Sequence, residues 1–205
     1  MPTLRVPAHP MTLQDVLDSY DRPGMVILLE GKREVEAEDQ PRLRRLGIVL
    51  AERTRHFRFR SGNAPGADAC FSAGVAGVAL DRLEVITPYA THRSRQKLAG
   101  TTYAVDSLTL TPEVIVHTQA HPSTRRQLER YVAGARDRYA IKAAYILRDT
   151  VKVLGCGEVI LPAALGIFYD DLDQPRLGGT GHTMRVCDAL GIPVLDQRVW
   201  MGWLD

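Results

Sequence analysis

Two glycine-rich segments carry the residue types that a bound phosphate group needs. The first has the sequence SGNAPGAD at residues 61–68, and the second has the sequence GGTGHT at residues 178–183. Each is expected to link a short apolar strand to a helix. Glycines let the backbone approach an anion closely, and the helix that follows directs free N–H groups and the positive end of its dipole at the same point. The pair therefore predicts a nucleotide phosphate site built from both halves of one sheet.

The residues predicted to contact this ligand come from three parts of the chain. An apolar run at residues 25–29 has the length of a buried parallel strand, and open α/β sheets bind ligands beyond the carboxyl ends of their strands. The alternative interpretation involves no ligand. In it, the glycines permit tight packing between a strand and the following helix, and the cations are solvated side chains. The predicted ligand-binding residues are Gly31, Lys32 and Arg33 after that strand, Ser61, Gly62, Asn63 and Gly66 in the first segment, and Gly178, Gly179, Thr180, Gly181, Thr183 and Arg185 in or beside the second.

The elements that would position these residues alternate between strands and helices. This alternation predicts an α/β fold with a Rossmann-like, mainly parallel sheet flanked by helices. The chain is divided into an N-terminal helical extension, residues 1–24, and a Rossmann-like nucleotide-binding domain, residues 25–205. Residues 91–110 have no clear assignment. Strands are predicted near residues 25–29, 57–60, 83–87, 163–169 and 194–195, and helices near 12–20, 38–53, 67–80, 125–132, 139–153 and 183–190.

The bulk composition sets broad limits. With 205 residues, 45% of them hydrophobic and 24% charged, the chain is expected to form a globular protein with a single main core. Its net charge of +2 is too small to indicate nucleic acid binding by itself. The three cysteines lack metal-ligand spacing, and neither a signal peptide nor the ~20 apolar residues of a membrane span is found. These features predict a cytoplasmic protein without a membrane partner.

The order of these motifs resembles the SLOG superfamily, which joins the Lonely Guy proteins to DNA-processing protein A. The resemblance covers residues 25–195 and includes the Leu147-Arg148-Asp149 step, which is similar to an internal Arg-Asn step whose arginine faces the ligand. It implies a Rossmann-like fold, a homodimer or higher homo-oligomer, and binding of nucleotides or nucleotide-derived signals. Some members hydrolyse nucleoside monophosphates to the free base, and others bind single-stranded DNA.

The second glycine-rich segment departs from the pattern of the Lonely Guy hydrolases. Those enzymes carry PGGxGTxxE, whereas this chain has Leu177, His182 and Arg185 in place of the proline, the threonine and the glutamate. An arginine cannot replace a carboxylate that stabilises an oxocarbenium ion or orients water. That reaction is disfavoured unless another acid, such as Asp68 or Glu30, takes over. Phosphate binding survives the change, because Arg185 adds positive charge near the segment.

Three functions follow, in order of preference. The first is a receptor, carrier or sequestering protein for a nucleotide or nucleotide-derived phosphate. The second is a hydrolase at the same site, with Asp68, Arg148 and His182 as candidate catalytic residues. The third is a single-stranded DNA-binding module, which the 6% aromatic content disfavours. No cofactor or metal site is assigned, although Asp170, Asp171 and Asp173 would suit Mg²⁺ beside a phosphate if they are not a solvated turn. The cluster of His92, Arg93, Arg95 and Lys97 is either a wall of the anionic site or exposed.

Overall fold

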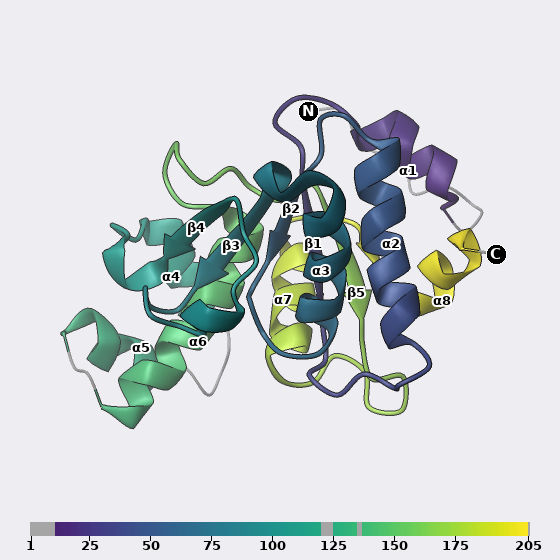
Figure 1. Cartoon of the computed structure of the whole chain (residues 1–205). Coiled ribbons are helices and arrows are strands. Elements are labelled where there is room, and N and C mark those ends of the chain that lie inside the picture. Colours follow the sequence, from purple (N-terminus) through teal and green to yellow (C-terminus); the bar gives the residue numbers. More distant parts are fainter. Residues whose placement is uncertain (1–10, 120–124, 135–136, 205) are drawn as a thin grey trace.

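A six-stranded, all-parallel sheet forms the centre of the computed structural model, which describes residues 11–119, 125–134 and 137–204 (Figure 1). The strand order is β4-β3-β2-β1-β5-β6. The chain runs outward from β1 to β4 and then crosses back to place β5 on the other side of β1. This reversal creates a crevice at the carboxyl ends of β1 and β5, the position where such sheets bind ligands. The strands are β1 Val26–Gly31, β2 Arg58–Ser61, β3 Leu83–Thr87, β4 Thr101–Ala104, β5 Leu165–Tyr169 and β6 Val194–Leu195.

Helices cover both faces of the sheet (Figure 1). On β1, Ile27 and Leu29 pack in the core with α2 and α3, whereas Leu28 packs with side chains of α6 and α7 on the opposite face. This alternation follows from the two-residue period of a strand, and it turns Glu30 toward α6 and α7. The helices are α1 Leu13–Tyr20, α2 Gln40–Arg53, α3 Ala67–Ala79, α4 Pro112–Gln119, α5 Arg125–Val132, α6 Arg138–Leu154, α7 Gly178–Ala189 and α8 Gln197–Trp200.

The α/β class and the parallel sheet predicted from the sequence are confirmed. Strand β4 lies within residues 91–110, for which the sequence gives no clear assignment. Within the predicted N-terminal extension, Leu13, Val16 and Tyr20 of α1 join the core that contains α2 and α3, and residues 1–10 lie outside the described part of the chain. No helix within the described ranges combines the length and the apolar character needed to cross a membrane.

The second glycine-rich segment differs from its expected form. The sequence predicts a loop leading to a helix at residue 183, but α7 already begins at Gly178. Glycines are poor helix formers, each costing about 1 kcal/mol relative to alanine. A glycine is needed at position 181 for a steric reason, because a Cβ there would collide with the carbonyl oxygen of Arg176. The residues of this segment that are predicted to bind phosphate therefore lie in a helix, from its first turn onward, and not in a loop.

A buried ion pair crosses the centre of the sheet. Arg60 of β2 is 1% exposed, and its Nε donates to Oε1 of Glu84 on β3 at 2.5 Å. Its Nη1 donates to the carbonyl oxygen of Lys152 on α6 at 2.7 Å. The guanidinium thus connects α6 to the sheet.

Replacing Arg60 by methionine should destabilise the fold by about 3–5 kcal/mol, because Glu84 loses its buried partner. Arg58→Met is the matched control: Arg58 pairs with the same Glu84 at 3.2 Å, but its side chain is 41% exposed. That variant should lose only about 0–1 kcal/mol. Urea unfolding followed by circular dichroism measures both, and equal losses would show that burial of the pair does not matter.

Candidate functional site

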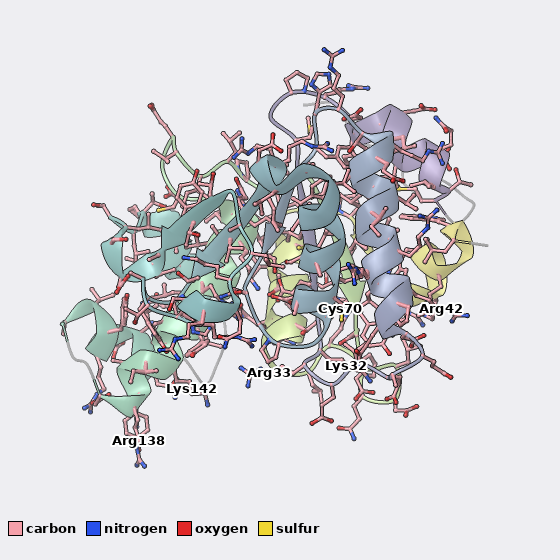
Figure 2. All side chains as sticks on the ribbon, in the orientation of Figure 1. Lys32, Arg33, Arg42, Cys70, Arg138 and Lys142 are labelled. Atoms are coloured by element: carbon pink, nitrogen blue, oxygen red, sulfur yellow. The ribbon has the colours of Figure 1, made fainter. Side chains whose placement is uncertain are left out.

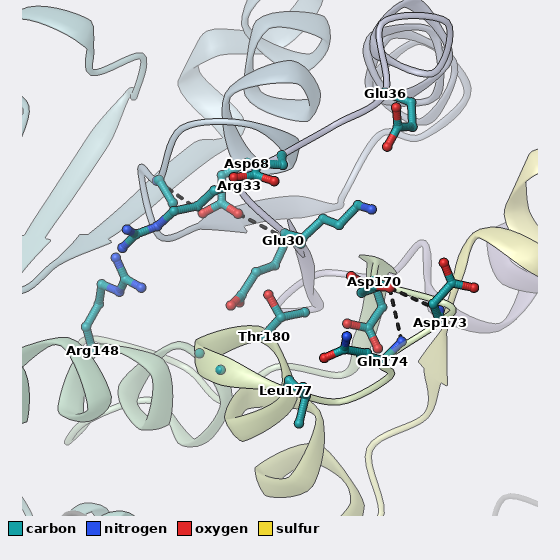
Figure 3. A pocket seen from close by; sticks show the side chains of 17 residues that line it. Glu30, Arg33, Glu36, Asp68, Arg148, Asp170, Asp173, Gln174, Leu177 and Thr180 are labelled. Carbon is teal, nitrogen blue, oxygen red and sulfur yellow. Dashed lines mark hydrogen bonds between the residues drawn. The ribbon is translucent and has the colours of Figure 1, made fainter.

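A pocket of about 670 Å³ opens at the crevice between the ends of β1 and β5 (Figure 3). Its walls come from the segment after β1, the start of α3, one side chain of α6, the turn after β5 and the start of α7. Both glycine-rich segments therefore contribute to one cavity. The lining residues are Glu30, Gly31, Lys32, Arg33, Glu34, Glu36, Ala64, Asp68, Arg148, Asp170, Asp171, Asp173, Gln174, Leu177, Gly178, Gly179 and Thr180.

The first turn of α7 presents backbone donors to this pocket. Leu177 is the N-cap residue, and its apolar side chain makes no capping hydrogen bond. The first bond within the helix is the one from the Gly181 N–H to the Leu177 carbonyl oxygen, at 3.0 Å. The N–H groups of Gly178, Gly179 and Thr180 consequently have no partner within the helix. Together with the helix dipole, they form one wall suited to an anion.

Two arginines form the cationic end of the pocket. Figure 3 shows the guanidinium groups of Arg33 and Arg148 on the same side of it, and Figure 2 shows Lys32 and Arg33 projecting from this edge of the molecule. Arg33 is exposed, whereas Arg148 is only 7% exposed. Arg148 donates through Nη1 to the Gly62 carbonyl oxygen at 3.1 Å and through Nη2 to Oδ1 of Asp149 at 2.7 Å. An anion between the arginines would relieve their mutual repulsion.

A network of buried charges lies beneath the pocket. Lys152 Nζ lies 2.6 Å from Oε2 of Glu30 and 2.9 Å from Oδ1 of Asp149. The hydroxyl of Thr183 on α7 donates to Oε1 of Glu30 at 2.9 Å. Burial raises the pKa of Glu30 to about 7, although the charge of Lys152 opposes this rise. The pocket therefore contains a carboxyl group whose protonated form is favoured by burial.

Asp68 holds together the two loops beside the pocket. Its carboxylate accepts hydrogen bonds from the backbone N–H groups of Gly31, Gly62 and Ala64, at 3.2, 2.9 and 3.3 Å. The Ser61 hydroxyl donates to the same carboxylate at 3.2 Å. The ends of β1 and β2 are thus joined by one side chain. This arrangement suits a structural role at the start of α3.

Gly66 brings the first glycine-rich segment against the segment after β1. Its φ of +83° favours glycine, and a Cβ would collide with the carbonyl oxygen of Arg33. The Asn63 side chain donates to the carbonyl oxygen of His92 at 3.4 Å, which joins the segment to the loop after β3. Gly66 and Asn63 do not line the pocket, but they hold in place the segments beside it.

The remaining predicted residues on α7 point elsewhere. His182 is 3% exposed, and its Nε2 lies 3.1 Å from the hydroxyl of Thr150 on α6. Arg185 is exposed and donates to the Arg176 carbonyl oxygen at 2.9 Å. Of the predicted site residues, the pocket is lined by Gly31, Lys32, Arg33, Asp68, Arg148, Gly178, Gly179 and Thr180, but not by Ser61, Gly62, Asn63, Gly66, Gly181, His182, Thr183 or Arg185.

The turn after β5 forms an acidic side of the pocket. Asp170 is buried and accepts a hydrogen bond from the Arg176 N–H at 2.8 Å. Asp171 accepts from the N–H groups of Asp173 and Gln174, and these bonds lower the pKa of its carboxyl. Over the described residues, no three His, Cys, Asp or Glu side chains come together as a metal site. Asp170 and Asp171 instead stabilise the turn through hydrogen bonds to its backbone.

Lys152, which connects Glu30 to Asp149, is not among the residues predicted from the sequence. A signal was present: Asp149 and Lys152, three residues apart, are charged residues on one face of a helix that is otherwise rich in alanine, leucine and valine. Charged residues are rarely buried unless they are paired. Such a helix therefore indicates a buried network, but the partner on β1 could not be named.

The comparisons with known proteins identify no family. No protein-family model and no curated protein matches the chain. Among solved structures, the chain is similar to DNA processing protein A from Helicobacter pylori, which was studied for its single-stranded DNA binding mode. The two are 14% identical with a TM-score of 0.46, over 91% of this chain and 69% of the other. A likeness at this level carries no functional conclusion.

Replacing Glu30 by glutamine should change how stability depends on pH. The pKa of Glu30 is about 7 in the folded protein against an ordinary value of 4.5, so the folded state binds this proton more tightly. The stability due to Glu30 is then fully present below pH 4.5 and is lost as the pH rises through 7. The free energy of unfolding of the wild type, minus that of Glu30→Gln, should fall between pH 5 and pH 8.

Urea unfolding at each pH measures this difference. The exposed Glu52 on α2 supplies the control Glu52→Gln, which removes one carboxylate far from the pocket. A difference between wild type and Glu30→Gln that stays constant with pH would contradict the raised pKa.

Proposed function

We propose that this protein binds a nucleotide or a nucleotide-derived phosphate and acts as a receptor, carrier or sequestering protein for it. The observation that carries the proposal is the arrangement of donors around one pocket. Arg33 and the buried Arg148 lie at one end, and the backbone N–H groups at the start of α7 lie in the same wall. Charge-assisted bonds from guanidinium groups and helix N-termini are the usual means of holding phosphate.

The size and charge of the pocket favour a small ligand. A volume of about 670 Å³ is within the range of small-molecule sites. Apart from Lys32 and the two arginines, the charged residues of the lining are acidic, and they include Glu34 and Glu36 after β1 and Asp170, Asp171 and Asp173 after β5. These carboxylates would repel the successive phosphates of a nucleic acid strand. A single phosphate at the arginine end avoids this repulsion. A nucleotide is therefore favoured over single-stranded DNA as the ligand.

Replacing Arg33 by alanine tests the proposed site, because Arg33 is exposed and its loss should leave the fold intact. Isothermal titration with adenosine monophosphate should show affinity weakened by about tenfold to a hundredfold, the value of one or two charge-assisted bonds. Arg45→Ala on α2 is the matched control, since Arg45 is exposed but lies outside the pocket lining. Equal affinities for the two variants would rule out the pocket as the phosphate site.

A hydrolase is the second candidate, and the observation that favours it is Glu30. This carboxyl lines the pocket, and its pKa of about 7 suits a general acid at neutral pH. In the reaction, the bond between C1′ and the base nitrogen breaks, its electron pair goes to the base, and Glu30 supplies the proton. Water bonds to C1′ and returns a proton to Glu30. One water is consumed, and free base and sugar phosphate leave.

Incubation with nucleoside monophosphates followed by chromatography distinguishes turnover from binding. If Glu30 is the acid, the wild type should release free base, Glu30→Gln should be slower by about a hundredfold or more, and Glu52→Gln should be unaffected. Release by the wild type and Glu30→Gln at the same rate would exclude Glu30. If the wild type binds these nucleotides without releasing free base, the hydrolase is excluded and the receptor function remains.

A further inference from the structure

A second cavity adjoins the phosphate pocket. Its volume is about 320 Å³, and it shares Arg33, Ala64 and Arg148 with the first pocket. Its other walls include Tyr89 and His92 from the loop after β3 and Tyr145 from α6, and we call it the aromatic pocket after these three residues. The two cavities therefore meet at the pair of arginines.

The three rings form a compact group. The ring centroids lie 5.4 Å apart for Tyr89 and His92, 5.5 Å for His92 and Tyr145, and 6.5 Å for Tyr89 and Tyr145, each pair nearly perpendicular. The Arg148 guanidinium carbon lies 5.4 Å from the Tyr145 ring centroid. Flat π surfaces of this kind suit a planar, unsaturated group.

His92, which lines this cavity, carries a buried hydrogen-bonding atom without a partner in the described part of the chain. The side chain is 7% exposed, and its buried Nε2 has no hydrogen-bond partner among the described residues. Its Nδ1 lies 3.5 Å from the Tyr145 hydroxyl. Burial, and then the charges of Arg148, Arg93 and Arg33, lower the pKa of His92 to about 4, so the ring is neutral at pH 7. A buried polar atom without a partner is costly, and a hydrogen bond from a ligand in the adjoining cavity would remove that cost.

The ligand chemistry follows from both features. The group in this cavity must present a flat face to the tyrosines and an uncharged polar edge to the imidazole. A sugar offers no π face, and an acyl chain offers no polar edge. We propose that the aromatic pocket binds the nucleobase of a ligand whose phosphate lies between Arg33, Arg148 and the start of α7. This inference rests on the proposed function and restricts it to nucleoside phosphates.

Titration calorimetry with two kinds of probe separates the two pockets. Ribose 5-phosphate reports on the phosphate pocket, and the monophosphates of adenosine, guanosine, cytidine and uridine report on both. The tightest nucleotide should bind the wild type about tenfold to a hundredfold more tightly than ribose 5-phosphate, the usual effect of stacking one base. His92→Phe keeps a ring but removes Nε2, and Tyr145→Leu removes a π surface. Both should reduce this preference, and His92→Phe should do so without weakening ribose 5-phosphate.

Tyr139→Leu is the matched control, because Tyr139 is an exposed tyrosine on the same helix, outside the aromatic pocket. It should leave every affinity unchanged. A wild type that binds ribose 5-phosphate as tightly as every nucleotide would overturn the base site and leave the phosphate site standing. The base site is equally overturned if His92→Phe weakens both kinds of probe to the same extent. Failure to bind any probe would overturn the proposed function, and this inference with it.

Discussion

The ion pairs of Lys152 are the interaction on which the rest of the pocket depends. Lys152 is fully buried on α6 and contacts carboxylates from two elements, Glu30 at the end of β1 and Asp149 on its own helix. A buried charge is tolerated only when partners compensate for its lost hydration. Because Glu30 also accepts the bond from Thr183, the network sets the position of α7 relative to β1. Asp149 in turn holds Arg148, one of the residues that both cavities share.

A second carboxylate performs a similar task on the other side of the pocket. Asp68 joins the ends of β1 and β2 through backbone N–H groups, and Arg148 reaches the same loop through the Gly62 carbonyl oxygen. The walls of the pocket are thus held by bonds within the protein, at the reversal of strand order between β1 and β5. Pre-formed donors lose little conformational freedom on binding, which favours affinity for a small anion.

Local patterns explain what the sequence could predict. The buried apolar runs of β1, β3 and β5 and the glycines that follow β2 are readable signals, and they identified the fold class and the residues at Gly31–Arg33 and Gly178–Thr180 that line the pocket. Strand β4 was missed because Thr101–Ala104 is short, partly exposed and polar. Contacts between distant elements, such as Lys152 with Glu30, follow from packing and leave no local pattern. For the same reason the burial of His182 against Thr150 could not be foreseen.

Arg148 lies in the wall between the two cavities, with Tyr145 on one side and the phosphate pocket on the other. Two halves of a ligand that share one guanidinium are not recognised independently. Fragments carrying only the heterocycle or only the anion would therefore sense each other, and their binding free energies would not add up to that of the intact molecule. A single substitution of Arg148 during evolution would therefore remove recognition of both the heterocycle and the anion.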